Sequence, residues 1–143
     1  MILIKRNSGF SLVEILIIAV IVGILSTIAI PNYARTMERS KCSQAMEILT
    51  NMRQAALLYF NENETFSGMD AAALETQANA DFDTTDENSY WNFSVTAAGA
   101  TSFTLQGIRT ASAGHPNNGL TITVNETGVW GGTYDRDNPV SGF

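Results

Sequence analysis

The most unusual residue in this sequence is Glu14, the only charged residue in an apolar run that covers residues 10–30. A carboxylate inside such a segment costs about 2.5 to 3.5 kcal/mol on membrane-insertion scales, and residues of this kind are usually retained for a function. Glu14 is therefore the first candidate for a functional side chain.

Other side chains with reactive chemistry are scarce. Cys42 is the sole cysteine, so an intrachain disulfide and the metal sites that need paired cysteines are both excluded. His115 is the sole histidine and lies in a turn-forming stretch, which predicts an exposed loop residue. The GxSxG, P-loop and HExxH patterns do not occur. We therefore expect no catalytic residues and a protein that is not an enzyme.

Four acidic residues between positions 81 and 87 form the one stretch with the composition of a cation site. The stretch lacks the glycine and the distal bidentate glutamate of an EF-hand loop. We interpret it as a solvated acidic segment, and we expect no bound metal and no cofactor.

Charge is unevenly distributed along the chain. Beyond Arg53 there are eleven acidic residues and only two basic ones, Arg109 and Arg136. Such a surface repels the phosphates of nucleic acids, whose binding needs a basic patch. The C-terminal region is therefore expected to present a solubilising acidic face and to have no nucleic acid partner.

The apolar run has the length of a membrane span. A helix over residues 10–30 extends about 31 Å, which matches the hydrocarbon core of a bilayer. Lys5 and Arg6 precede the run, so the positive-inside rule predicts a cytoplasmic N-terminus and an exported C-terminal region. A secretory signal peptide ending near Thr27-Ile28-Ala29 and a plain membrane anchor are the alternatives, and neither explains Glu14.

Helical periodicity continues beyond the apolar run. Pro31 directly follows the run and is expected to bend the helix, because proline removes one hydrogen bond. From Asn32 to about Glu62, apolar residues recur at spacings of three and four, which predicts an amphipathic helix. The predicted apolar stripe consists of Tyr33, Cys42, Ala45, Met46, Leu49, Met52, Ala56, Tyr59 and Phe60.

The rest of the chain predicts a small antiparallel sheet. Strand-like runs cover residues 90–95, 102–106 and 120–124, and turn residues occupy 97–100 and 126–128. Only the striped helix is available to cover the apolar face of this sheet, so the predicted fold class is α+β.

The sequence also predicts the nature of the segment before the sheet and the surface against which the helix packs. The segment 66–88 is interpreted as a variable connector with a weak helical patch near residues 69–77. The helix stripe needs a partner surface, and the alternating third strand supplies one. We expect Cys42, Met46, Leu49, Met52 and Phe60 to pack on Leu120, Ile122 and Val124.

The N-terminal residues together form a recognisable pattern. Two basic residues are followed by Gly9, Phe10, a small hydroxyl residue, two aliphatic residues and Glu14, and the run then continues to Pro31-Asn32-Tyr33. This arrangement resembles the prepilin-type cleavage and methylation segment of the type IV pilin and pseudopilin family. The resemblance covers about the first 35 residues.

The resemblance implies a role for each of these residues. Gly9 would be the last residue of a leader, cut by a prepilin peptidase, and Phe10 would become the N-methylated N-terminus. Glu14 would pair with the freed Phe10 amine of a neighbouring copy, and an ammonium in the same apolar layer does compensate a carboxylate. The implied domains are a leader (1–9), a transmembrane and assembly helix (10–30), its amphipathic continuation (31–62) and an antiparallel β head with an acidic connector (63–143).

The resemblance also implies a fold, partners and a location. The fold would be a long kinked N-terminal helix packed on the head. The partners would be membrane lipid before assembly, an inner-membrane assembly platform and further copies of the chain in a helical filament. The subunit would be a single-pass inner-membrane protein at first and part of an extracellular pilus afterwards.

Four functions stay open at this point. The favoured one is a structural subunit of a type IV pilus for adhesion, motility or surface attachment. The alternative is a type II secretion pseudopilin acting as a periplasmic piston, although the Asp-Pro-Trp-Gly stretch common in the major secretion pseudopilin is absent. A DNA-uptake pilin that grips DNA is disfavoured by the acidic head. The fourth possible function is that of a membrane-anchored adhesion or enzyme module outside the family.

Overall fold

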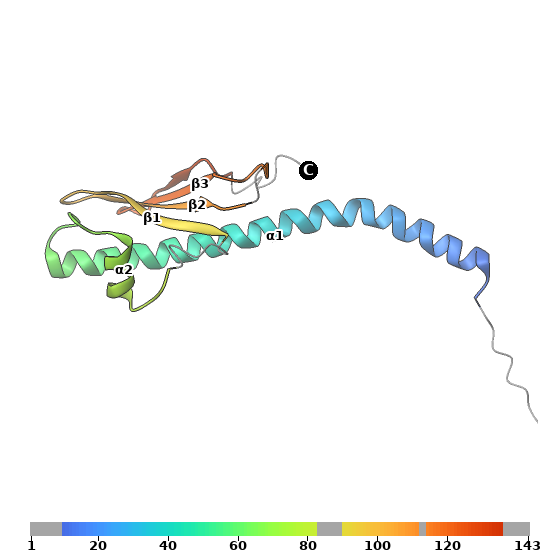
Figure 1. The fold of residues 1–143 in the computed structure, drawn as a ribbon, viewed down its shortest axis with the longest axis horizontal. Helices are drawn as coiled ribbons and strands as arrows, with labels where there is room; N and C mark the ends of the chain where they lie inside the picture. The colour runs from blue at the N-terminus through green and yellow to red at the C-terminus, as the bar shows by residue number, and fades with distance from the viewer. Residues whose placement is uncertain (1–9, 83–89, 112–113, 136–143) are drawn as a thin grey trace, which may run out of the picture. The chain divides into compact units, whose positions relative to one another are not determined.

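The computed structural model describes residues 10–82, 90–111 and 114–135. The described elements are two helices and a four-stranded antiparallel sheet, which confirms the predicted α+β class (Figure 1). The chain divides into two compact units, Met1–Thr36 and Met37–Phe143, and the second is called the head below. The elements are α1 (Leu12–Asn63), α2 (Ala71–Ala78), β1 (Trp91–Ala98), β2 (Phe103–Arg109), β3 (Thr121–Asn125) and β4 (Trp130–Gly132).

Helix α1 begins two residues after Phe10 and is unbroken at Pro31. The hydroxyls of Ser26 and Thr27 donate to the carbonyls of Val22 and Ile24 at 2.7 Å each, so these polar groups are satisfied within the helix itself. Among the described residues α1 is the one helix long and apolar enough to cross a membrane, and none of its most apolar stretch is buried. The bend at Pro31 stays a prediction.

The core of the head lies between α1 and the sheet, as the stripe predicted. Cys42, Leu49 and Met52 are buried with Ile122 and Val124 in one hydrophobic cluster. Met46, Phe60 and Leu120 pack against the same cluster and are partly buried, which confirms the predicted packing. Tyr33 differs, since its side chain is exposed although the pattern placed it on the stripe.

The sheet is a simple meander in which β1, β2, β3 and β4 pair in chain order. Gly107 of β2 lies opposite Phe93 of β1 and Ile122 of β3. A Cβ on Gly107 would come within 3.0 Å of the Phe93 ring, so glycine leaves the space that the buried aromatic side chain occupies.

Arg53 ties α1 to the turn between β3 and β4. Its guanidinium donates to the backbone carbonyls of Asn125 at 3.2 Å and Glu126 at 2.7 Å. The turn also contains Gly128 at φ +83°, a left-handed conformation that glycine adopts without strain. The predicted turn at 126–128 is therefore present and is held against the helix.

The predicted variable connector is more ordered than expected. Its patch at 69–77 does form a helix, α2, and the Asp70 carboxylate caps it by accepting from the Ala73 backbone N–H at 2.8 Å. Four apolar side chains of the connector are buried in the head core, so the segment covers the core and is not a free linker. They are Phe66, Met69, Leu74 and Phe82.

The strands also correct the sequence analysis. β1 continues through Ala98 into the predicted turn at 97–100, across a register shift between Val95 and Ala97. β2 continues to Arg109, and β4 was not predicted at all. The reason is that β4 is three residues long and two of them are glycines, so it has no alternating pattern.

Candidate functional site

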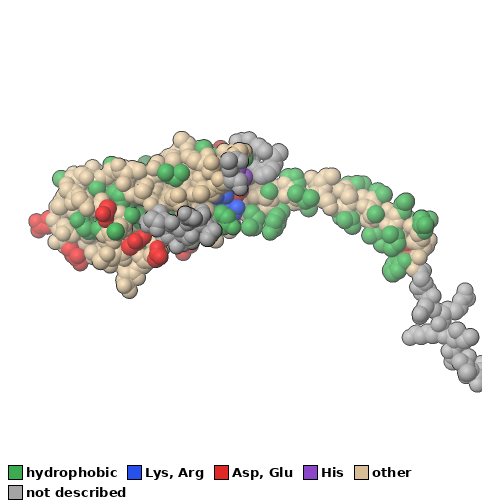
Figure 2. Space-filling model, in the orientation of Figure 1, with side chains coloured by type: hydrophobic (Ala, Val, Ile, Leu, Met, Phe, Trp, Pro, Cys, Tyr) green, Lys and Arg blue, Asp and Glu red, His purple; other side chains and the backbone are tan. Residues whose placement is uncertain are grey.

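The apolar segment at residues 10–30 is the largest exposed hydrophobic surface of the described chain. Phe10 is 74% exposed and Leu12 is 81% exposed, and the other large apolar side chains of the segment are exposed as well. Figure 2 shows hydrophobic side chains along this part of α1. Apolar surface on this scale marks a membrane or protein contact.

Glu14 lies in the first turn of α1, within this exposed apolar surface. The two ion pairs found among the described residues do not include it. A carboxylate in the first turn also interacts favourably with the partial positive charge of the helix N-terminus. The single chain therefore provides Glu14 with a helix end and leaves its proposed charge partner to another molecule.

The structure describes only some of the other predicted N-terminal site residues. Phe10 is exposed and precedes α1, whereas Gly9 and the basic residues Lys5 and Arg6 lie outside the described residues. Cleavage after Gly9 and methylation of Phe10 are therefore carried forward as proposals.

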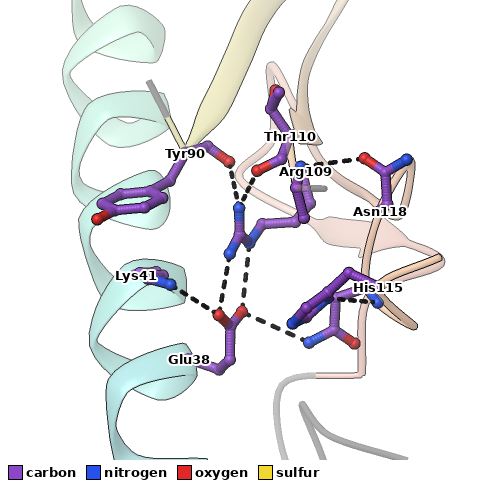
Figure 3. A network of polar contacts seen from close by, with 9 residues as sticks. Glu38, Lys41, Tyr90, Arg109, Thr110, His115 and Asn118 are labelled. Atoms are coloured by element: carbon purple, nitrogen blue, oxygen red, sulfur yellow. Dashed lines mark hydrogen bonds and ion pairs between the residues drawn. The ribbon is translucent and has the colours of Figure 1, made fainter. Parts of the chain in front are cut away.

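The head contains a buried ion pair that the sequence analysis missed. Glu38 of α1 and Arg109 of β2 are 4% and 2% exposed, and they form a bidentate pair (Figure 3). Arg109 Nη2 donates to Glu38 Oε1 at 2.9 Å, and Arg109 Nε donates to Glu38 Oε2 at 3.2 Å. Arg109 Nη1 donates to the backbone carbonyls of Tyr90 and Thr110. The guanidinium therefore connects α1, β2 and the residue before β1.

Two further side chains donate hydrogen bonds to the Glu38 carboxylate. Lys41 Nζ donates to Oε1 at 2.9 Å, and Asn117 Nδ2 donates to Oε2 at 3.4 Å. Lys41 Nζ also lies 4.3 Å from the centroid of the Tyr90 ring, which is a cation–π contact. These side chains connect α1 with Arg109 at the end of β2 and with Asn117 in the loop between β2 and β3.

The environment of Glu38 changes its pKa. Burial alone would raise it, but the hydrogen bonds from Arg109 and Lys41 and the attraction of their charges outweigh burial and lower the pKa from 4.5 to about 2. The carboxylate is therefore ionised at any physiological pH, so the ion pair with Arg109 does not depend on pH in that range.

The sequence did contain a signal for this pair. Glu38 lies four residues before Cys42, so it continues the buried stripe of α1 by one turn toward the N-terminus. In β2, Arg109 is separated from Leu105 by four residues, so its side chain is on the same, inward-facing side of the strand. Two opposite charges that both occupy inward positions predict a buried pair. From the sequence, Arg109 was considered only as part of the net charge of the acidic region.

The remaining reactive side chains do not assemble into a site. Cys42 is buried in the core, and His115 lies in a loop, as predicted, but is only partly exposed. His115 Nδ1 accepts from the Asn117 backbone N–H at 3.2 Å. Within residues 10–82, 90–111 and 114–135 no group of three potential metal ligands occurs, and most of the acidic stretch at 81–87 lies outside these ranges.

Comparison with known proteins agrees with the N-terminal pattern. A family model described as a prokaryotic N-terminal methylation motif matches residues 4–30. The type IV major pilin protein PilA of Myxococcus xanthus is 42% identical over 62 residues, which cover 43% of this chain and 28% of PilA. The fimbrial protein EcpC of Eikenella corrodens is 33% identical over 67 residues, which cover 47% of this chain and 44% of EcpC.

A secretion protein is similar over the same share of the chain. The type II secretion system core protein G of Aeromonas hydrophila is 30% identical over 71 residues, which cover 47% of this chain and 50% of that protein. The matches to these three relatives thus span half of their length or less.

A solved structure matches the fold, and a family model matches much of the head. The crystal structure of the non-core minor pilin PilV of Neisseria meningitidis aligns with a TM-score of 0.52 and 22% identity over 68% of this chain and 88% of PilV, which shows a shared fold. A second family model, described as type IV minor pilin ComP, DNA uptake sequence receptor, matches residues 31–117. Because this match covers more than half of the chain, the chain belongs to that family of type IV pilins.

Proposed function

We propose that this protein is a structural subunit of a type IV pilus, which polymerises through α1 into an extracellular filament for adhesion, motility or surface attachment. The observation that carries the proposal is the exposure of the apolar segment at residues 10–30 in the single chain. Such a surface needs lipid before assembly and other copies of the helix after it, because water is a poor solvent for it.

The proposed course of assembly uses the N-terminal residues in order. A prepilin peptidase cuts between Gly9 and Phe10, and the Phe10 amine is methylated. The subunit is held in the inner membrane by residues 10–30 until an assembly platform adds it to the filament. In the filament, Glu14 lies opposite the amine of a neighbouring Phe10, and each charge compensates the other in an apolar layer.

Replacement of Gly9 tests the proposed processing. In cells that carry Gly9→Leu, we expect uncleaved precursor to accumulate in the membrane and surface filaments to be lost, because a bulky side chain occupies the position next to the cut bond. Immunoblots of membrane and sheared-filament fractions measure both results, and N-terminal sequencing of the parent should start at Phe10. Parent material that starts at Ile30 would show an ordinary signal peptide.

The similarity to the type II secretion core protein G supports a second candidate, a pseudopilin that acts as a periplasmic piston. The two candidates differ in where the filament is found and in what its loss changes. A pilus subunit is recovered from cells by shearing, whereas a piston remains in the periplasm and its deletion stops the release of exported enzymes. Deleting the gene and assaying both the sheared fraction and enzyme release decides between them.

The family description names a DNA uptake sequence receptor, so DNA binding by the head is the third candidate. Three of the four described basic residues of the head argue against it: Arg109 is buried in its ion pair, Arg53 donates to two backbone carbonyls, and Lys41 is bonded to Glu38. The fourth, Arg39, is exposed. Phosphate binding needs several accessible cations.

We therefore expect that the head does not bind DNA directly. The full chain in detergent micelles should not retard duplex DNA at a protein concentration of about 100 µM and physiological salt, the weak end of non-specific binding. Retardation that weakens steeply with added salt would instead establish the receptor function. A basic nucleic-acid-binding protein at the same salt is the positive control.

A further inference from the structure

The loop between β2 and β3 contains an asparagine followed by a glycine, Asn118-Gly119, and both residues are exposed. Gly119 has φ +79°, a left-handed conformation that glycine adopts without strain. Asparagine is one of the chemically labile residues of proteins, and a following glycine has no side chain to shield its backbone nitrogen. Asn118 is therefore a candidate site for spontaneous deamidation.

Deamidation at this position involves atoms of both residues. The backbone nitrogen of Gly119 gives up its proton and attacks Cγ of Asn118, so that a new carbon–nitrogen bond closes a succinimide ring. The bond from Cγ to Nδ2 breaks, and the leaving nitrogen departs as ammonia with the proton of the Gly119 nitrogen. Water then opens the ring to aspartate or isoaspartate. The reaction needs a Gly119 nitrogen released from hydrogen bonding and an Asn118 side chain that can turn toward it.

The fold restrains both of the groups that must react. The Gly119 backbone N–H donates to the Arg109 carbonyl at 2.9 Å. Asn118 Oδ1 accepts from the Ala111 backbone N–H at 3.0 Å, so the side chain is tied to another part of the loop (Figure 3). Both hydrogen bonds must break before the two groups can meet, and the reaction therefore proceeds only from a locally opened loop.

The buried ion pair anchors this part of the loop. Arg109, whose carbonyl accepts from Gly119, is held through its guanidinium on the Glu38 carboxylate. Asn117, the residue before Asn118, is buried, and its Nδ2 donates to the same carboxylate at 3.4 Å. Loss of the Glu38 carboxylate therefore weakens the attachment of the loop on both sides of the reactive bond.

We propose that Asn118-Gly119 is a deamidation site that the folded loop suppresses, and that the ion pair of Glu38 and Arg109 holds the loop in the unreactive conformation. Isoaspartate inserts an extra main-chain carbon at position 118, which displaces the backbone hydrogen bonds of Asn118 and Gly119. The ion pair thus protects the covalent structure of the loop as well as its packing. All of these groups lie in the head, so the site exists whether or not the chain assembles into a filament.

Deamidation of the parent chain tests the suppression. The full chain is incubated at mildly alkaline pH in detergent micelles and, in parallel, in guanidinium chloride. Peptide mapping by mass spectrometry follows the conversion of Asn118 to aspartate and isoaspartate. We expect conversion in the folded chain to be at least about tenfold slower, the factor that corresponds to a local opening of about 1.4 kcal/mol. Equal rates, or an Asn118 that persists in the denaturant as well, would overturn the proposal.

Variants of the folded chain test the role of the ion pair. We expect Glu38→Gln to speed the conversion of Asn118 about tenfold or more, because the loop loses its anchor on α1. Glu47→Gln removes an exposed glutamate of the same helix, and its rate should stay within about twofold of the parent. A folded Glu38→Gln chain that converts at the rate of the parent would show that the ion pair does not hold the loop.

Leu74→Ala separates a local effect from a loss of overall stability. Leu74 is fully buried in α2, so its truncation destabilises the head through a cavity but leaves the ion pair in place. Asn118 should then convert within about twofold of the parent's rate, and an increase equal to that of Glu38→Gln would overturn the local role of the pair. Arg109→Lys keeps a cation beside Glu38 but cannot reproduce the bidentate pair, so it should also speed conversion. It replaces Glu38→Gln in the comparison if that variant does not fold.

Discussion

Cells that carry Glu14→Val are expected to lose surface filaments by about a hundredfold or more, while cleaved subunit persists in the membrane. The filament is measured by shearing and immunoblotting, and the membrane pool by fractionation of the same cells. The magnitude follows from the cost of leaving one charge of a buried pair without its partner, about 3 to 5 kcal/mol, because about 1.4 kcal/mol is a tenfold change in an equilibrium. In Glu14→Val that unpaired charge is the Phe10 amine.

Membrane insertion does not explain why Glu14 is present. Its removal makes the segment more apolar by about 2.5 to 3.5 kcal/mol on insertion scales, so Glu14→Val should insert at least as well as the parent. The place of Glu14 in the first turn of α1 contributes about 0.3 to 1 kcal/mol through the helix dipole, which is too little to abolish assembly. A charge partner on a neighbouring copy accounts for the larger effect.

Ser26→Val is the matched control for Glu14→Val. It also replaces a polar side chain of the apolar segment with valine, but the Ser26 hydroxyl donates to the Val22 carbonyl of its own helix. Filament yield should therefore stay near that of the parent. Abundant filaments from Glu14→Val would contradict the charge pair. An equal loss from Ser26→Val would show that added apolarity, and not the missing charge, is responsible.

The sequence predicted those parts of the fold that have a repeating pattern. The spacing of Cys42, Leu49 and Met52 gave the buried side of α1, and the alternation of Ile122 and Val124 gave the inner face of β3. Each pattern repeats over enough residues for one face to be distinguished from the other. The N-terminal pattern gave the family, which the match over residues 4–30 and the match over residues 31–117 support.

The parts that were missed depend on contacts between distant residues. β4 exists because Trp130 pairs with Val124, and nothing in its three residues indicates this. Phe66 and Phe82 lie in a stretch of polar and small residues, so their burial becomes visible only once the core is assembled. The pair of Glu38 and Arg109 is separated by 71 residues, and its residue types are almost never fully buried unless they are paired. Two charges at inward positions were the available signal.

Glu38→Gln is expected to lower the free energy of unfolding of the full chain in detergent micelles by about 3 kcal/mol at pH 7. The physical reason is that the variant leaves the guanidinium of Arg109 buried without its carboxylate. Urea unfolding followed by tryptophan fluorescence measures the change, because Trp91 is packed on Tyr134 in the core of the head. Glu47→Gln is the matched control. It removes an exposed glutamate of the same helix and should change stability by less than about 0.5 kcal/mol.

The pH dependence of Glu38→Gln identifies the ion pair as the cause. A carboxylate whose pKa falls from 4.5 to about 2 on folding contributes stability above pH 4.5, and this contribution is lost as the pH falls toward 2. The difference in unfolding free energy between the parent and Glu38→Gln should therefore stay nearly constant above about pH 5 and shrink as the pH falls from about 5 to 2. The double variant Glu38→Met with Arg109→Met should lose less stability than Glu38→Gln, since two apolar side chains leave no buried charge, although the Tyr90 and Thr110 carbonyls lose their donor. A double variant as unstable as Glu38→Gln, with a difference that does not change with pH, would show that the shape of the side chains and not their charge stabilises this end of the head.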